Sequence, residues 1–178
     1  MATLAFKERP EFIRGEQFER SLSWYLQARG WSVLPVYNYA GTEQKAPALE
    51  AHGGDLVLPD LLGARAGVVL WCEAKRKARA DLTRVTGRLE TGLSLRLLDQ
   101  YREVKARTGI DVWIFFGHEL EDEVRCCEID KVRWRAMPQA NGMGRGGMAF
   151  VGWDDLAHFV TFSTVMDGFE MARRMDGA

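Results

Sequence analysis

Two charged residues stand two positions apart at the end of the apolar run VVLWCEAK, where Glu73 is followed by Lys75. In a β-strand, residues i and i+2 point to the same face, so this carboxylate and this ammonium are expected side by side. The spacing alone is a weak signal, because it recurs at 43–45 and at 103–105. Only the pair at 73 and 75 follows a strand-like apolar run, which makes it the candidate site.

A second carboxylate reaches this pair if LVLPDLL and GVVLWCEAK form a β-hairpin across GARAG, which has glycine at both ends. With the turn centred near Arg65, Asp55 lies opposite Lys75, and a two-residue shift in register places Asp55 opposite Glu73. The alternative is Asp60, of the literal Pro-Asp pair. We prefer Asp55, because Asp60 has even parity and lies close to the turn, where its side chain is expected to point away from Glu73.

Two carboxylates beside an ammonium suit a hard divalent cation, Mg²⁺ or Mn²⁺. Such an ion binds one or two carboxylates, keeps several waters and takes phosphate oxygens of a substrate. It also lowers the pKa of water and stabilises charge on a phosphate under attack. In this hypothesis Asp55 and Glu73 hold the ion, with the Ala74 carbonyl as a candidate further ligand. Lys75 either orients the attacking water or stabilises the transition-state charge, and both roles stay open.

The elements that would position these residues follow from periodicity and turn residues. A helix is expected over 15–30, where Phe18, Leu22, Tyr25 and Leu26 have helical spacing. A long helix is expected over 81–108, with a break near Gly87 or Gly92 as the alternative. Strand-like runs cover 31–39, 111–119 and 123–132, in addition to the hairpin, and a short helix begins at Asp154. Polar or glycine-rich loops are expected over 40–54 and 137–150. This order predicts the α/β class, with a single mixed central β-sheet flanked by helices.

GGDLVLPDLL followed by VVLWCEAKRK resembles the PD-(D/E)xK nuclease superfamily, and RGEQFERSLSWYLQARGWSV resembles the opening helix of its Holliday-junction-resolvase-like branch, with Gly15, Phe18 and Glu19 as the matching residues. The likeness covers roughly 14–117 and implies a restriction-endonuclease-like core. It also implies that Glu19 faces the metal site as a further ligand and that Gln100 lies near it. Glu16 is the nearest substitute for Glu19.

Charge is unevenly distributed along a chain whose formal net charge is −1. Between 74 and 107, ten basic residues stand against four acidic ones, whereas 111–130 is mainly acidic. A basic face that contacts phosphates is expected, although a solvated helix face is the plain alternative. The candidate nucleic-acid-binding residues are Arg76, Lys77, Arg79, Arg84 and, from the resemblance, Gln100.

Several other site types are disfavoured. The three cysteines form no CxxC pair, the histidines His52, His118 and His158 are scattered and need only surface or capping roles, and the glycine-rich loop lacks the GK[ST] ending of a nucleotide site. The sequence has neither a signal peptide nor an apolar run near membrane-spanning length, so a cytoplasmic protein without a membrane or nucleotide partner is expected.

The 178 residues are expected to form a single domain, with a core at about 14–117 and C-terminal strands and a glycine-rich loop over 118–178. The sequence thus predicts a Mg²⁺-dependent DNA endonuclease, on branched or otherwise structured DNA, and the resemblance implies a homodimer. Restriction-type and repair nucleases would share the same residues. The competing hypothesis is a non-catalytic nucleic-acid-binding or protein-interaction module that keeps the nuclease fold.

Overall fold

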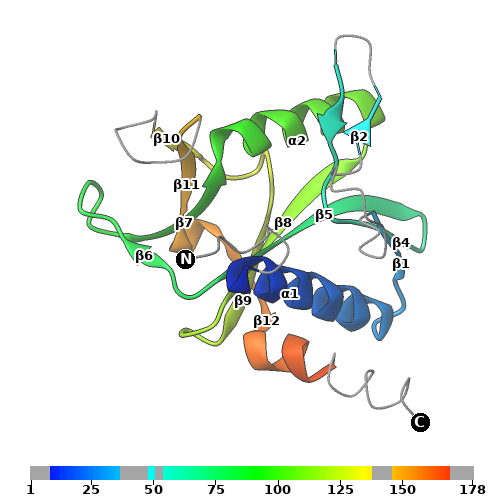
Figure 1. Ribbon diagram of the computed structural model, residues 1–178, viewed down its shortest axis with the longest axis horizontal. Coiled ribbons are helices and arrows are strands. Elements are labelled where there is room, and N and C mark those ends of the chain that lie inside the picture. Colours follow the sequence, from blue (N-terminus) through cyan, green and yellow to red (C-terminus); the bar gives the residue numbers. More distant parts are fainter. Residues whose placement is uncertain (1–8, 37–47, 51–53, 138–145, 169–178) are drawn as a thin grey trace, which may run out of the picture.

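The computed structural model describes residues 9–36, 48–50, 54–137 and 146–168 (Figure 1). Its central element is a six-stranded sheet in the order β1-β4-β5-β8-β9-β12. The two middle strands, β5 and β8, run parallel, and each of the other neighbouring pairs is antiparallel. The strands are β1 Ser32–Pro35, β4 Leu61–Arg65, β5 Val68–Lys77, β8 Asp111–His118, β9 Glu123–Glu128 and β12 Ala157–Thr161.

Two smaller sheets lie beside it. One has four strands in the order β10-β11-β7-β6, with bounds Arg135–Met137, Met148–Gly152, Leu89–Ser94 and Asp81–Leu82. The other pairs β2 with β3, which span Ala48–Leu49 and Leu56–Val57. The helical elements are α1 Pro10–Gln27, α2 Leu95–Thr108, the 3-10 turn η2 Trp153–Asp155, and a helix over 162–168.

Each face of the central sheet has its own hydrophobic core. Phe18 and Leu22 of α1 pack with Cys72 and Phe115 on one face, together with Phe162 at the start of the last helix. On the other face, α2 and the four-stranded sheet supply the cover, and their buried residues pack against Trp71, Val112, Ile114 and Phe116. The predicted α/β class, a mixed central sheet flanked by helices, is confirmed.

The first helix forms where helical spacing predicted it, although it begins earlier, at Pro10. Proline suits the first helical turn because its missing N–H would have no partner there. The expected stripe of Phe18, Leu22, Tyr25 and Leu26 is buried. Gly30, with a φ of 80°, ends the element as predicted.

The predicted long helix over 81–108 is wrong in its first half. Residues 81–94 form the β6–β7 hairpin, and α2 begins only after Ser94, whose side chain accepts a hydrogen bond from the Leu97 N–H at 3.3 Å. The pairing of β7 with β11 explains why a strand forms here instead of a helix. Gly92 allows the two strands to approach, because a Cβ at this position would clash with the Ala149 carbonyl oxygen. This tertiary partner, far along the chain, overrides the helical spacing of the leucines.

The remaining expectations are met in part. The predicted loop over 40–54 contains strand β2, and the predicted loop over 137–150 contains the end of β10 and the first residues of β11. Strands β8 and β9 match the predicted strands, and η2 begins at Trp153, one residue before the predicted helix start. Outside the described residues lie 40–47 and 51–53 of the first predicted loop, 138–145 of the second, and 37–39 of the strand-like run 31–39. No helix in the described part of the chain is long and apolar enough to cross a membrane.

Candidate active site

The β4–β5 hairpin turns through only two residues, Ala66 and Gly67, which both have positive φ values of 49° and 82°. A two-residue turn of this kind pairs residues of opposite parity. The observed register is Leu61 opposite Cys72, so its next step places Asp60 opposite Glu73. The predicted register, centred near Arg65, is therefore wrong.

Asp60 is held in place by the backbone of the facing strand. Its Oδ2 accepts a hydrogen bond from the Ala74 N–H at 2.9 Å. Burial raises the pKa of Asp60 well above its ordinary value, the negative charges of Glu73 and Glu19 raise it further, and Lys75 opposes them. Glu73, Glu19 and Lys75 are therefore close enough for their charges to act on Asp60.

Asp55, which we preferred from the sequence, lies elsewhere. It is exposed and precedes β3, which pairs with β2 in the separate two-stranded sheet and not with β5. The preference failed because it assumed a turn of odd length, and a single residue more or less in a turn reverses which side chains share a face. The literal Pro-Asp pair, Pro59-Asp60, marks the aspartate that faces Glu73.

Glu73 and Lys75 point to the face of the sheet that α2 covers, because they alternate with Cys72 and Ala74, which belong to the opposite core. Their neighbours on the parallel strand β8 are Ile114 and Phe116. The Glu73 residue is 0% exposed, and its Oε1 forms an ion pair with Lys75 Nζ. The predicted convergence of these two side chains is confirmed.

Glu19 comes to the site from α1. It is 6% exposed, although its helical neighbours along the same face are apolar core residues. Burying a carboxylate costs free energy. The negative charge of Glu19 raises the pKa of Asp60, so the two carboxylates lie close together. Glu16, the alternative, instead forms an ion pair with Arg20 one turn along the helix.

One observation indicates that Asp60 and Glu73 are suited to bind a divalent cation. Both carboxylate oxygens of the buried Glu73 lack a hydrogen-bond partner among the described residues, although Lys75 stands beside Oε1. In the described residues no group of three or more His, Cys, Asp or Glu side chains is arranged to hold a metal as it stands. Two carboxylates suffice for Mg²⁺, which keeps several water ligands. Asp60 and Glu73 supply that number.

The residues predicted to contact nucleic acid have different environments. Arg76 is held within the protein, because its Nε donates to Glu119 Oε1 at 2.8 Å and its Nη1 to the Arg14 carbonyl at 3.2 Å. Lys77 lies on the same face as Lys75, and burial, followed by the charge of Lys75, lowers its pKa. Arg79 and Arg84 are exposed.

Gln100 lies on α2, on the side of the sheet to which Glu73 points, and its buried Oε1 has no hydrogen-bond partner among the described residues. An uncompensated buried amide oxygen costs free energy unless another group satisfies it. The position near the metal site that the family resemblance implies for Gln100 stays a prediction. A contact between Gln100 and substrate stays a prediction.

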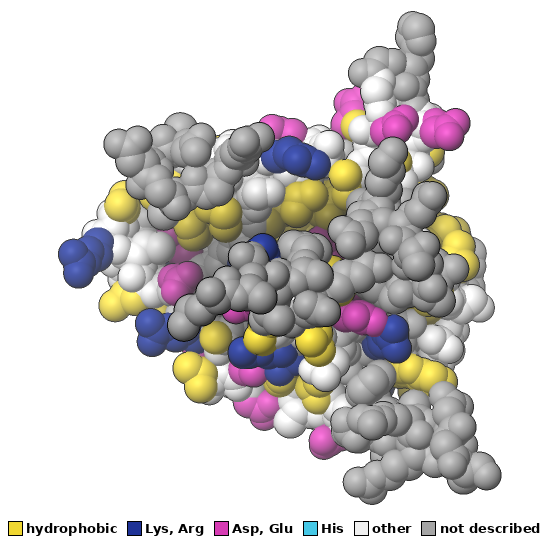
Figure 2. Space-filling view, viewed as in Figure 1, with side chains coloured by type: hydrophobic (Ala, Val, Ile, Leu, Met, Phe, Trp, Pro, Cys, Tyr) yellow, Lys and Arg dark blue, Asp and Glu magenta, His cyan; other side chains and the backbone are white. Residues whose placement is uncertain are grey.

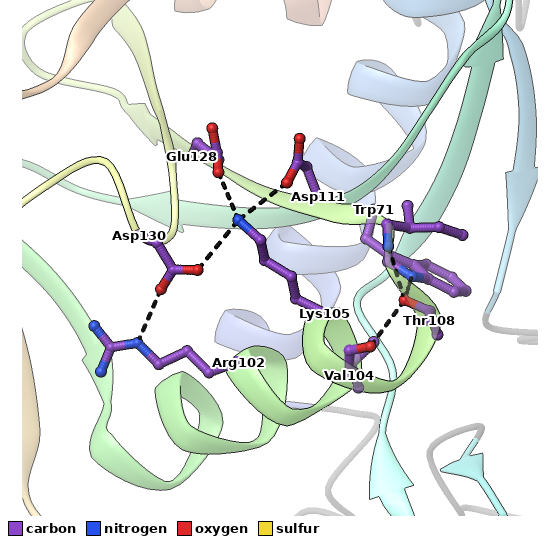
Figure 3. Close-up of polar contacts among 9 residues, drawn as sticks. Trp71, Arg102, Val104, Lys105, Thr108, Asp111, Glu128 and Asp130 are labelled. Carbon is purple, nitrogen blue, oxygen red and sulfur yellow. Dashed lines mark hydrogen bonds and ion pairs between the residues drawn. The ribbon is translucent and has the colours of Figure 1, made fainter.

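Part of the basic stretch is neutralised internally. Lys105 Nζ, on α2, contacts three carboxylates, Glu128 at 2.6 Å, Asp111 at 3.0 Å and Asp130 at 3.1 Å, and Arg102 contacts Asp130 as well (Figure 3). These acidic groups raise the pKa of Lys105, with Glu128 the largest cause. The basic and acidic runs of the sequence therefore neutralise each other where α2 meets the ends of β8 and β9. Lys105 is a structural residue, not part of a phosphate-binding face.

His118 is the residue whose position sequence reasoning missed, since a surface or capping role was expected. It is fully buried at the end of β8, its Nε2 lies 3.1 Å from Thr91 Oγ1, and burial lowers its pKa to about 4. The signal was present, because Val112, Ile114 and Phe116 alternate toward the same face and His118 continues their series.

The comparisons with known proteins support the fold. No protein-family model and no curated protein matches the chain. Among solved structures, the chain is similar to Hjc, a Holliday junction resolvase from the archaeal hyperthermophile Archaeoglobus fulgidus, with a TM-score of 0.53 and 13% identity over 85% of this chain and 99% of that one. D212, a nuclease from a fusselovirus, also matches, with a TM-score of 0.42 and 12% identity over 98% of both chains, a likeness too low to carry an argument. The fold of this chain is therefore similar to that of the archaeal resolvase, and the expected resolvase-like architecture is found.

Proposed function

We propose that this chain is a metal-dependent DNA endonuclease that hydrolyses phosphodiester bonds with Asp60, Glu73, Lys75 and Glu19. The observation that carries the proposal is the carboxylate pair across the β4–β5 hairpin, in which Asp60 stands opposite a fully buried Glu73. A partly buried and a fully buried carboxylate this close repel each other unless a cation or a proton lies between them. Such an arrangement is costly for stability, so it favours a functional site.

Asp60 and Glu73 would hold Mg²⁺ or Mn²⁺, with Glu19 as a further ligand and the Ala74 carbonyl as another candidate. When bound, the ion would supply Lewis acidity and charge neutralisation at the scissile phosphate. Asp60 is fixed for this role, because the Ala74 N–H occupies its Oδ2 and thereby orients the carboxylate. Glu19 would come from α1, a separate element, and so couple the helix to the site.

Lys75 would act on the substrate side of the site. Its ammonium already contacts Glu73 Oε1 and is partly exposed, with 29% of the side chain accessible. From there it is suited to orient an attacking water by hydrogen bonding, or to stabilise negative charge on the phosphate. Neither function requires Lys75 to accept a proton.

The DNA would extend across the basic side chains that follow Lys75. Lys77 continues the same face of β5, and the exposed Arg79 and Arg84 follow it along the chain. Such contacts position the backbone without reading sequence. The likeness of fold to a Holliday junction resolvase supports branched DNA as the substrate. The homodimer that the sequence resemblance implies stays a prediction.

One observation favours a second candidate, a DNA-binding module without catalysis. Glu73 already has a cationic partner in Lys75, and no ready three-ligand metal group exists among the described residues. A module of this kind would bind DNA equally well with and without a chelator. It would release no product with any divalent ion.

The deciding experiment measures cleavage of labelled single-stranded, duplex, flapped and four-way-junction DNA with Mg²⁺ or Mn²⁺. Wild type should cut at least one of these substrates, and Glu73→Gln and Lys75→Ala should bind it without cutting. Glu103→Gln is the matched control, because Glu103 forms an exposed ion pair with Arg107 on α2 and should leave cleavage unchanged. Binding without cleavage by the wild type under every metal condition would establish the binding module instead.

A further inference from the structure

The β6–β7 hairpin carries apolar side chains into solvent. Leu82 is 70% exposed, Val85 is 75% exposed, and Leu89 is 41% exposed. Leu82 and Leu89 are directly opposite each other in the hairpin register, so they share one face, and Val85 lies in the turn between the two strands. Scattered exposed apolar residues are ordinary, but three on one projecting tip form a patch that calls for a partner.

The tip is ordered by its own hydrogen bonds. The Thr83 N–H donates to the Arg88 carbonyl at 3.0 Å, and the Gly87 N–H donates to the Thr83 carbonyl at 2.9 Å. The Thr86 hydroxyl donates to Glu90 Oε1 at 3.0 Å. The exposed apolar side chains therefore stand on a preorganised turn, which reduces the entropy that a binding partner must remove.

The base of the hairpin is fixed to the body of the protein. Glu90 forms an ion pair with Arg135 of β10, and its pKa is lowered, mainly by that bond. The Oγ1 of the next residue, Thr91, lies 3.1 Å from Nε2 of the buried His118 in the central sheet. The hairpin also leaves directly from the carboxyl end of β5, the strand of Lys75 and Lys77. Figure 1 shows it projecting from the body at the left.

The charges around the patch are mainly basic. Arg79, Arg84 and Arg88 are exposed on or beside the hairpin, against the exposed Asp81, since Glu90 is already paired with Arg135. In the space-filling view, dark blue side chains lie beside yellow ones at the left, where Figure 1 places this hairpin (Figure 2). An apolar tip flanked by guanidinium groups is complementary to a polyanion that also exposes flat apolar surfaces.

We propose that the tip of the β6–β7 hairpin is a wedge that packs against unstacked bases at a branch point in DNA, with Arg84 and Arg88 on the adjacent phosphates. This inference rests on the proposed function for its ligand, DNA, and adds how the chain would distinguish branched from linear DNA. Leucine is among the side chains that insert between bases in DNA-bending proteins. Inside a continuous duplex the wedge must unstack a base step, whereas at a branch that cost is already reduced.

The test measures binding in chelator, where no cleavage occurs, by fluorescence anisotropy of a four-way junction and of a linear duplex of the same length. The junction carries 2-aminopurine at the branch in one preparation and within an arm in another. Wild type should bind the junction more tightly than the duplex and raise the 2-aminopurine fluorescence at the branch alone. The variant Leu82→Ser/Val85→Ser should lose about tenfold in affinity for the junction, and little for the duplex.

Leu120→Ser is the matched control, because Leu120 is 74% exposed but lies in the turn between β8 and β9. It should bind both DNAs like wild type. Both hairpin substitutions replace solvent-exposed side chains, and circular dichroism melting checks that each variant is folded. Equal junction affinity in the hairpin variant and wild type would overturn the proposal, as would equal binding of junction and duplex by the wild type.

Light scattering distinguishes DNA from a second copy of this chain as the partner of the hairpin tip. If Leu82→Ser/Val85→Ser turns an oligomer of wild type into a monomer, the tip is a contact between copies of this chain and the wedge is excluded. Cleavage is measured separately from binding, so the two proposals can fail independently. Normal cleavage with an unaffected hairpin variant overturns only the wedge, and hairpin-dependent junction binding without cleavage overturns only the nuclease.

Discussion

Asp60 stands opposite Glu73 across the β4–β5 hairpin, and the Ala74 N–H next to Glu73 donates to Asp60 Oδ2 at 2.9 Å. The same strand thus supplies one carboxylate and orients the other. Asp55 offers a matched comparison, because it has the same chemistry, is nearby in sequence and is exposed outside this hairpin.

Asp60→Asn should reduce DNA cleavage by about 100-fold or more, whereas Asp55→Asn should leave it within about twofold of wild type. The asparagine keeps an oxygen that accepts the Ala74 N–H but removes the negative charge that faces the buried Glu73. Thermal unfolding gives a readout independent of activity. Asp60→Asn should melt at a higher temperature than wild type in chelator and should lose the stabilisation that Mg²⁺ or Mn²⁺ gives the wild type. Equal loss of cleavage in both variants would contradict the assignment.

The stability of the fold should fall in mild acid because of His118. Its pKa is about 4 in the folded chain, against about 6.5 for an unperturbed histidine, so below pH 6.5 the unfolded chain binds the extra proton first. The contribution of His118 is fully present above pH 6.5, is lost as the pH falls toward 4, and does not change further below that. The expected loss between pH 7 and pH 5 is about 2 kcal/mol.

Urea unfolding at the two pH values measures this loss. His118→Gln, which keeps a polar group facing Thr91, should remove most of the pH dependence, although it costs stability at pH 7. His158→Gln is the control, because His158 is exposed on β12. The same pH slope in wild type and His118→Gln would rule out this histidine as the cause.

Lys105→Gln should destabilise the fold without affecting DNA binding. The substitution leaves Glu128, Asp111 and Asp130 without their shared cation, which should cost about 1 to 2 kcal/mol, a modest value because the site is partly exposed. Urea denaturation measures the cost. The salt dependence of DNA binding should be unchanged in Lys105→Gln, whereas Arg84→Gln should lower its slope by about 1, and the reverse pattern would refute the structural role of Lys105.

Gly117→Ala should disrupt the packing between the central sheet and its helices. A Cβ at this position of β8 would lie 2.5 Å from the Phe18 ring of α1 and 2.9 Å from Phe162, so both rings must move. Overpacking of this kind costs about 1 to 3 kcal/mol.

Gly15→Ala is the opposite case, since nothing lies within 4 Å of a Cβ placed there and alanine favours the helix. It should raise the free energy of unfolding by about 0.5 to 1 kcal/mol. Calorimetry measures the change in unfolding temperature of Gly117→Ala and of Gly15→Ala relative to wild type.

Much of the fold follows from local patterns of the sequence. The stripe of Phe18, Leu22 and Leu26 predicts α1, and the apolar runs before Glu73 and after Asp111 predict β5 and β8. These patterns are reliable because helical and strand periodicity depend on residues close together in the chain. The alternation along β5 also predicts, correctly, that Glu73 and Lys75 share a face.

The register of one hairpin and the non-local strand pairing decided the rest. The choice between Asp55 and Asp60 depended on a two-residue turn at Ala66 and Gly67, and turn length sets register while leaving the strand pattern unchanged. The start of α2 depended on β11, which pairs with β7 and turns a helical leucine pattern into a hairpin.

The charged residues also show what the sequence predicts and what only packing decides. The basic and acidic runs are visible in the sequence, but only packing brings Lys105 to Glu128 and leaves Arg84 in solvent. The sequence by itself determined α1, β5, β8 and β9, and that an acid and a lysine stand together on β5. The tertiary structure decided which aspartate joins them, because register and charge pairing depend on segments that meet only when the chain folds.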